Sequence, residues 1–216
     1  LAPVIRLAQA AGYDTCTIAL TTALDAARRE GIDAIGFRDL AFLATPQAIE
    51  FGDELAASLP SGPVSREESR VYLGVGFCEL VEQHGLDAAR EIFKARGRQA
   101  FLPTGFMASV IEHVAPDVVV ATSAPRSERA AIVAAGAAGI PAVCLVDLFA
   151  TAEIEWVGEN AYASKLCVLN DQVRQRVIAH GRSSPDVVVT GNPAFDSLVE
   201  ERFVERGAEL RSSLGW

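Results

Sequence analysis

The clearest pattern of apolar and polar positions lies between residues 115 and 147. Two apolar runs, residues 118–121 and 141–146, contain no polar alternation. Short runs of this kind are typical of strands in parallel sheets, which are buried on both faces. We therefore predict two neighbouring parallel strands and place them at the centre of the fold.

The segment between these two runs has the signals of a helix. It opens with a polar loop at residues 122–128, in which Ser123 is a candidate N-cap and Pro125 suits the first turn. Glu128 stands where the positive end of a helix dipole favours a carboxylate, and Gly139 is placed to end the helix. Strand, helix and strand in this order predict one right-handed βαβ unit.

The alternation of strand and helix continues on both sides of this unit. We expect strands at residues 15–20, 32–37, 165–169 and 186–189, and helices at residues 1–11, 22–29 (with Thr21 or Thr22 as its cap) and 171–180. Asn170 is another candidate N-cap, and Asn192 with Pro193 predicts the start of the last long helix. This order predicts an α/β fold: one Rossmann-like domain over residues 1–216, with a parallel sheet and helices on both faces.

Residues 41–114 interrupt the alternation with a helical insertion. The expected helices cover residues 46–59, 66–84, 86–96 and 102–114. Ser65 begins one of them with a capping box, in which Glu68 is the reciprocal partner. An insertion of this kind could serve as a lid, as an acceptor-binding surface or as packing alone, and the sequence leaves these three roles open.

Composition limits the classes of function. A hydrophobic share of 50% supports a packed core and argues against disorder. The net charge of −9 argues against a broad surface for DNA or RNA, so no nucleic-acid partner is predicted, although a local anion site stays open. No apolar run approaches the roughly 20 residues that a membrane-spanning helix needs, so no transmembrane segment is predicted.

Cysteine usage indicates a reducing environment. None of the four cysteines belongs to a CxxC pair: Cys16, Cys78, Cys144 and Cys167. All of them except Cys78 lie inside predicted strands. We interpret them as buried, reduced thiols of a cytoplasmic protein, in preference to disulfides or metal ligands.

Several motifs that would announce a reaction do not occur in the sequence. It contains no GxxxxGK[ST] loop, HExxH pair, GxSxG elbow or GxGxxG after a strand. Gly74 and Gly76 lie inside a predicted helix, so they do not form a dinucleotide-binding turn. The sequence therefore predicts neither a metal site nor a bound cofactor.

The first functional candidates follow a central strand, because ligands of open α/β sheets bind beyond the carboxyl ends of the strands. The loop after residues 118–121 carries Ser123, Arg126, Ser127 and Glu128. Hydroxyl groups and a guanidinium at a helix N-terminus favour a phosphate or a carboxylate. The structural alternative is a capped helix in which Arg126 pairs with Glu128 or with a neighbouring acid.

Further candidates follow the other predicted strands. Asp147 ends the second central strand and has Glu153 close behind it. These carboxylates could hold a sugar hydroxyl, act as a base or simply be solvated. Asn170 follows the next strand, and Gly191 with Asn192 forms a sharp turn after the last one.

The order of these pieces resembles a known group of enzymes. The run "PDVVVATSAP…AAGAAGIPAVCLVD", followed by "LCVLNDQVRQRVIAHGRSSPDVVVTGNPAFDSL", is similar to the second half of the N-terminal domain of GT-B fold proteins. Within that group it resembles non-hydrolysing sugar-nucleotide 2-epimerases and related bacterial glycosyltransferases, as used in polysaccharide biosynthesis. The resemblance covers residues 115–198 well and residues 1–40 loosely.

The resemblance implies an acceptor-side domain of a sugar-nucleotide-dependent glycosyltransferase. GT-B proteins have two Rossmann-like domains, and the C-terminal one, which we expect to be absent here, holds most of the sugar nucleotide. The nucleotide-sugar would be a substrate, so no cofactor is implied, and a homodimer stays open. Asp147 or Glu153 would be the catalytic base. The implied ligand contacts come from the strand-end loops: Ser123, Arg126, Ser127, Glu128, Asn170, Gly191 and Asn192.

Two alternatives remain. The first is an enzyme like UDP-N-acetylglucosamine 2-epimerase, whose family shows a His-Val-Glu-Ala-Gly-like run where this sequence has Leu-Val-Asp-Leu-Phe at residues 145–149. The second is a ligand-binding or assembly module without catalysis. We also expect a strand and a phosphate-side loop to precede Leu1, and we expect the present chain alone to be inactive.

Overall fold

The computed structural model describes residues 1–60, 62–199 and 201–216. In this described part, six strands form two parallel sheets. The smaller sheet contains β1 (Thr17–Ile18) and β2 (Ala34–Ile35). The larger has the order β3-β4-β5-β6: β3 (Val119–Thr122), β4 (Ala142–Leu145), β5 (Lys165–Val168) and β6 (Val187–Val189). All six predicted strands and their parallel direction are confirmed, and the fold is α/β.

The single sheet expected from the sequence is divided. β3 pairs with β4, since Val119 N–H donates to the carbonyl of Pro141, and β1 pairs with β2. Among the described residues no strand lies between β1 and β3, so β1 and β3 each keep one edge without a ladder partner. The Rossmann-like arrangement is therefore compatible with the structure, but its two halves are not hydrogen-bonded to each other.

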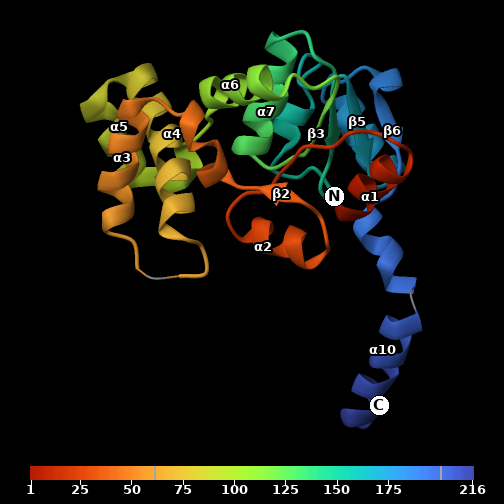
Figure 1. Ribbon diagram of the computed structural model, residues 1–216. Coiled ribbons are helices and arrows are strands. Elements are labelled where there is room, and N and C mark those ends of the chain that lie inside the picture. The colour runs from red at the N-terminus through yellow and green to blue at the C-terminus, as the bar shows by residue number, and fades with distance from the viewer. Residues whose placement is uncertain (61, 200) are drawn as a thin grey trace.

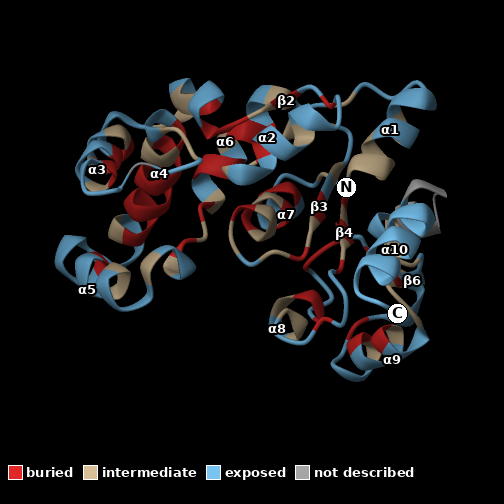
Figure 2. Ribbon diagram, turned by 90° about the horizontal axis from the view of Figure 1, so that it is seen from below, coloured by how far each residue is buried: buried red, intermediate tan, exposed pale blue. Residues whose placement is uncertain are grey.

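The larger sheet is buried mainly on one face. Ala121, Cys144, Leu166 and Val187 align across the four strands and are all buried. Because the strand order advances in one direction, right-handed crossovers place α7 (Ser127–Ala137), α8 (Ile154–Val157) and α9 (Asp171–Ala179) on the same side (Figure 2).

The opposite face of this sheet is more open. Val120 of β3 and Val188 of β6 are each 43% exposed. The helix α1 (Ala2–Ala10) lies on this side in Figure 2 but buries no residue. The expectation of a strand buried on both faces is therefore wrong for β3.

Helices predicted along the chain are largely confirmed. The others outside the insertion are α2 (Thr22–Arg29), the short 3₁₀ segments η3 (Ser184–Asp186) and η4 (Pro193–Val199), and α10 (Glu201–Ser213). Asn192 was expected to begin the last long helix, but Pro193 begins the 3₁₀ helix η4 instead. The long helix α10 begins only at Glu201.

The four helices expected within residues 41–114 are also confirmed: α3 (Pro46–Ala57), α4 (Arg66–His84), α5 (Leu86–Arg96) and α6 (Thr104–Val114). The same part of the chain also contains the 3₁₀ helices η1 (Phe37–Leu43) and η2 (Gly97–Ala100). In Figure 1, α3, α4 and α5 gather on one side of the molecule, and α6 and α7 lie between them and the larger sheet. A side-chain hydroxyl caps α4 as predicted, because Ser65 Oγ accepts from Glu68 N–H at 3.2 Å.

The insertion shares one hydrophobic core with the larger sheet. A continuous cluster of buried side chains joins α4 and α6 to β3–β6. Aromatic contacts extend it, with Tyr72 packed edge-on against Phe37 and Phe101. Gly74 of α4 lies against the backbone of α3, where a Cβ atom would collide with Ala48, so this glycine allows the two helices to pack closely.

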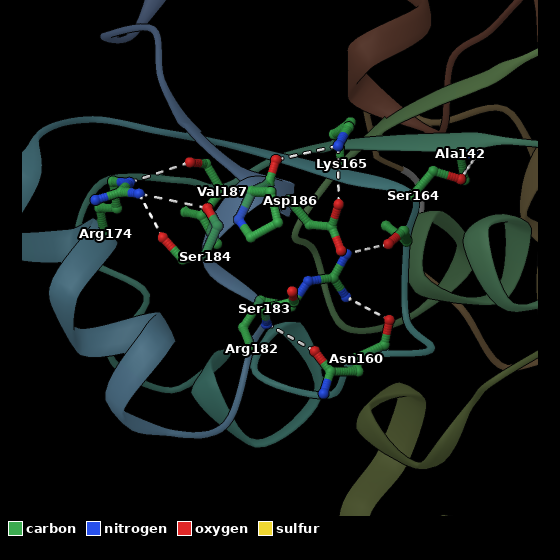
Figure 3. Close-up of polar contacts among 12 residues, drawn as sticks. Ala142, Asn160, Ser164, Lys165, Arg174, Arg182, Ser183, Ser184, Asp186 and Val187 are labelled. Carbon is green, nitrogen blue, oxygen red and sulfur yellow. Dashed lines mark hydrogen bonds and ion pairs between the residues drawn. The ribbon is translucent and has the colours of Figure 1, made fainter.

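A buried arginine ties together the loops at the amino-terminal edge of β5 and β6 (Figure 3). Arg182 is 2% exposed and donates to the carbonyls of Glu159 at 2.6 Å, Asn160 at 3.0 Å and Ala163. Beside it, Lys165 forms a 2.8 Å ion pair with Asp186. This network lies at the opposite edge from the predicted site, so we assign it to stability.

Two whole-chain expectations can be compared with the structure. The cysteines are free thiols; Cys78 and Cys144 are buried, but Cys16 is exposed, contrary to expectation. Cys16 lies just before β1, in the open loop from α1. Within the described residues, no helix combines the length and apolar character needed to cross a bilayer.

Candidate functional site

A cavity of about 120 Å³ lies where the loop after β1 meets the loop after β3. We call it the α2–α7 cavity, after the two helices that begin at its wall. Seven residues line it: Leu20, Thr21, Tyr72, Arg98, Arg126, Ser127 and Glu128. The carboxyl ends of parallel strands are where ligands bind in this fold class. The cavity is therefore the candidate site.

A larger hollow of about 260 Å³ between α3 and α4 is a weaker candidate. Its Arg70 already pairs with Asp53, with 2.5 Å between Nε and Oδ1. Arg66 and Glu67 on its rim are exposed. Because its main cation is neutralised within the protein and it lies away from the strand ends, we do not assign it a ligand.

The N-terminus of α7 forms one wall of the α2–α7 cavity. Arg126 occupies the N-cap position, and its side chain makes no capping hydrogen bond. The amides of Ser127 and Glu128 donate to no group in the described part of the chain. Ser127 is 2% exposed, and its buried Oγ also has no partner there. Two backbone amides and one hydroxyl at this helix N-terminus are thus free to donate hydrogen bonds, as in helix termini that bind anions.

The N-terminus of α2 forms a second wall. Thr21, one of the two residues predicted to cap α2, is its N-cap residue. Its side chain, however, makes no capping hydrogen bond. Its backbone has φ 50° and ψ −115°, an unusual conformation for a residue other than glycine. The cavity is therefore bordered by the positive ends of two helix dipoles.

Two guanidinium groups and a phenol complete the polar lining. Arg98 and Arg126 form no ion pair with any described acidic residue. Tyr72 lines the cavity and is 5% exposed. Burial raises the pKa of Tyr72, and the nearby positive charges of Arg126 and Arg98 oppose that rise. Both cations are therefore close enough to act on whatever occupies the cavity.

Glu128 supplies the one carboxylate of the lining. Its Oε1 accepts a long, 3.4 Å hydrogen bond from Thr122 Oγ1. The structural alternative from the sequence, an ion pair between Arg126 and Glu128, is not formed. Arg126 is consequently available to a ligand, as the sequence-based hypothesis requires.

Ser123 does not face this cavity. It was expected to be the N-cap of α7, but that helix starts later, with Arg126 at the N-cap. Ser123 is fully buried, and its Oγ accepts a 3.0 Å hydrogen bond from Asp147 N–H. Its hydroxyl joins the ends of β3 and β4, so it stabilises the sheet edge next to the cavity instead of contacting a ligand.

The two candidate bases lie at the same sheet edge but outside the cavity lining. Asp147 is exposed after β4 and forms no ion pair with a described residue. Glu153 is half-buried at the N-cap of α8, which is held against α7 by Arg129 stacked over the ring of Trp156 at 4.9 Å. Their catalytic roles stay predictions.

The candidates after β5 and β6 use their polar groups locally. Asn170 Oδ1 caps α9 by accepting from Val173 N–H at 3.0 Å, as predicted. Gly191 has φ 76°, so the expected glycine turn is confirmed. Asn192 Oδ1 accepts from Ala194 N–H at 2.9 Å. None of the three candidates lines the cavity, and their ligand contacts stay predictions.

Sequence reasoning missed four of the seven residues that line the cavity. Leu20 and Thr21 come from the loop after β1, Tyr72 from α4, and Arg98 from η2. Thr21 was noted only as a helix cap, and nothing in the pattern around Tyr72 or Arg98 separates them from other helical residues. A strained threonine that does not cap its helix becomes visible only in the structure.

Neither a metal-binding group in the described residues nor a similar known protein assigns a function to the chain. In the described residues, no group of three or more His, Cys, Asp or Glu side chains is placed to hold a metal ion. Comparisons with protein-family models, curated proteins and solved structures found no match. The geometry of the cavity is therefore the main guide to function.

Proposed function

We propose that this chain binds an anionic ligand group, a phosphate or a carboxylate, in the α2–α7 cavity. We propose further that it acts as the acceptor-side domain of a sugar-nucleotide-dependent glycosyltransferase. The observation that carries the first proposal is the meeting of two helix N-termini with Arg98 and Arg126, neither of which pairs with a described acid. The second proposal adds the sequence resemblance.

Electrostatics favour an anion at this point of an otherwise acidic chain. Each helix N-terminus acts as about half a positive charge, and two guanidinium groups add two full charges against the single carboxylate of Glu128. Charge-assisted hydrogen bonds from arginine and free backbone amides are roughly twice as strong as neutral ones. The charge around the cavity is thus positive, although the whole chain carries a net charge of −9.

Size selects the part of a ligand that fits. The cavity volume of about 120 Å³ corresponds to roughly four water molecules in the liquid, at about 30 Å³ each. Such a space accepts one phosphate or carboxylate group with a few neighbouring atoms, and it is smaller than the sites of drug-sized ligands. This supports a role on the acceptor side, with the bulk of a nucleotide-sugar held elsewhere.

Glu128 supports a ligand that also carries hydroxyl groups. Its carboxylate borders a positive cavity, and its hydrogen bond from Thr122 is long, so it can accept a second, shorter bond from a ligand. A sugar that bears a phosphate or a carboxylate combines both requirements. Asp147 at the end of β4 remains the proposed base for such an acceptor.

The alternatives differ in their support. A non-catalytic binding module needs only the cavity, so the same observation favours it. The epimerase alternative has no observation of its own in the structure. Turnover with UDP-sugars separates a transferase from a binding module, whereas the anion site is common to both.

The direct experiment is calorimetric titration of the chain with inorganic phosphate, UDP and UDP-sugars. Arg126→Ala should weaken phosphate binding about tenfold or more, the loss expected from one charge-assisted hydrogen bond. Its free energy of unfolding should stay within about 1 kcal/mol of wild type, since no ion pair is lost. Arg206→Ala, on the exposed surface of α10, is the matched control and should change neither quantity.

Two outcomes would refute the anion site. One is a wild-type chain that does not bind phosphate. The other is an Arg126→Ala variant that binds as tightly as Arg206→Ala.

A further inference from the structure

We propose that Thr21 is a ligand-contacting residue of the α2–α7 cavity and that Glu68, from the helical insertion, is the positioning residue that holds it there. The inference rests on the proposed anion-binding function and names two residues that the sequence marked only as helix-capping residues.

Thr21 occupies a backbone conformation that threonine normally avoids. Ala23 N–H donates to the Leu20 carbonyl at 2.8 Å, which closes a tight turn with Thr21 as its first central residue. With φ 50° and ψ −115°, that position has the geometry of a type II′ turn, where glycine dominates. A β-branched residue is strained there, and strain of this kind persists mainly at functional sites.

Helix formation does not account for the threonine. An N-cap threonine is normally favoured because its hydroxyl accepts from an amide of the first turn. Thr21 makes no such bond, and its hydroxyl has no partner in the described chain. Thr21 is instead one of the residues that line the cavity. Its hydroxyl is therefore free to donate to an anion that the two arginines attract.

Glu68 stabilises the strained turn. This carboxylate is 2% exposed, and its Oε1 accepts from Thr21 N–H at 3.2 Å. Its Oε2 accepts from Arg38 N–H at 3.0 Å, in the segment that follows β2. One side chain of α4 therefore binds the backbone after both strands of the smaller sheet. A buried carboxylate is tolerated at this place because backbone donors satisfy it.

The Glu68 carboxylate binds the Thr21 and Arg38 amides in place of the amide at the start of its own helix. The sequence predicts a capping box, in which the carboxylate would return to the Ser65 amide. Ser65 performs its half of that motif, whereas the Glu68 carboxylate crosses to the β1 and β2 loops. Gly36 leaves room for it, because a Cβ atom there would lie 2.5 Å from Glu68 Oε2.

The same helix also supplies a direct wall of the cavity. Tyr72 follows Glu68 by one helical turn on α4 and lines the cavity itself. Of the three roles left open for the insertion, the structure thus favours a surface that contributes to ligand binding. α4 both contacts the ligand, through Tyr72, and fixes a second contact, through Glu68.

The test uses variants with two independent readouts. The first is the hydrogen-exchange rate of the Thr21 and Arg38 amides by NMR, which needs no ligand. The second is phosphate affinity by calorimetry. Glu68→Gln keeps only one of the two acceptor oxygens, so it should speed exchange of at least one of the two amides by about tenfold or more and weaken phosphate binding. Glu67→Gln, at the exposed neighbouring position, is the control and should leave both readouts unchanged.

Thr21 variants separate contact from conformation. Thr21→Gly suits the backbone angles, so it should unfold at the same or a higher temperature, yet bind phosphate about tenfold more weakly because the hydroxyl is gone. Thr21→Ser keeps the hydroxyl and should bind like wild type.

The Thr21 contact and the positioning role of Glu68 can be refuted separately. A Thr21→Gly variant with wild-type affinity would show that Thr21 does not contact the anion. Wild-type exchange rates in Glu68→Gln would remove the positioning role. If the wild-type chain binds no phosphate, the proposed function and the Thr21 contact fall together, whereas the exchange rates still decide what Glu68 does.

Discussion

The backbone N–H of Asp147 donates a 3.0 Å hydrogen bond to the hydroxyl of Ser123, which is fully buried. The bond joins the carboxyl ends of β3 and β4, immediately beyond the last paired residues of the two strands. It also separates the roles of two residues that the sequence offered for the same site. Ser123 holds the carboxyl ends of β3 and β4 together, whereas the Asp147 residue that it binds is exposed to solvent.

Replacing Ser123 with Ala tests this supporting role. The variant leaves the Asp147 amide without its acceptor, so the free energy of unfolding should fall by about 1–2 kcal/mol. Urea denaturation of both proteins measures the difference. Ser58→Ala removes an exposed hydroxyl that bonds only the Leu55 carbonyl, and it should cost less than about 0.5 kcal/mol. Equal losses in the two variants would contradict the assignment.

Arg182 should be far more important for stability than other arginines of its region. Arg182→Met keeps much of the side-chain volume but leaves the carbonyls of Glu159, Asn160 and Ala163 without their donor, so we expect a loss of about 3 kcal/mol or more. The control is Arg176→Ala, which removes an exposed bond to the Phe149 carbonyl and should cost about 1 kcal/mol or less.

The same variant gives a second check by thermal denaturation and phosphate titration. Arg182 lies at the edge opposite the cavity, so its loss should lower the unfolding temperature and leave phosphate affinity unchanged below that temperature. A variant as stable as Arg176→Ala would show that the buried guanidinium is dispensable.

Glu79 should make stability depend on pH. Its carboxylate is buried, accepts from Phe106 N–H at 3.0 Å and from Thr104 Oγ1 at 3.1 Å, and thereby caps α6. Burial raises the pKa of Glu79 above its usual value of 4.5, and the hydrogen bonds from Phe106 and Thr104 offset only part of that rise. The folded state therefore favours the protonated acid.

The sign of the effect follows from this raised pKa. The contribution of Glu79 to the free energy of unfolding is fully present below pH 4.5 and is lost as the pH rises through the raised pKa. Glu79→Gln does not titrate. The stability of wild type relative to this variant should therefore decrease between pH 4.5 and neutral pH in urea titrations. A constant or increasing difference would contradict the expectation.

Thiol labelling should follow burial. Cys144 is fully buried in β4, and burial raises its pKa to about 12. At pH 8 only about 10⁻⁴ of such a thiol is thiolate, the reactive form. Cys16 is exposed and should react first with a thiol reagent such as DTNB, whereas Cys144 should react only on unfolding. Mass spectrometry of partially labelled protein identifies the order, and early labelling of Cys144 would refute it.

Local elements could be predicted from the sequence because their causes are local. All six strands appear where short apolar runs predicted them. Ser65 and Asn170 cap the helices that follow them, and Gly191 takes the positive φ expected of its turn. Each of these features depends on a few consecutive residues, whose side chains or backbone freedom act within one turn of chain.

Contacts between distant segments could not be predicted in the same way. The α2–α7 cavity combines Thr21, Tyr72, Arg98 and Arg126, which come from four separate elements. Periodicity shows which face of a helix is apolar, but it does not show which loop that helix will meet. The roles of Tyr72 and Arg98 therefore emerged only from the packing of the insertion against the strand ends.

The sequence by itself determined the α/β order of elements, the parallel direction of the strands and the presence of a helix after β3. The tertiary structure decided that the strands form two sheets, that Ser123 is buried beneath the site, and that Glu68 leaves its capping box to hold Thr21. The physical reason is that a buried polar group takes the partner that folding brings within reach. For Ser123 and Glu68, that partner lies 24 and 47 residues away.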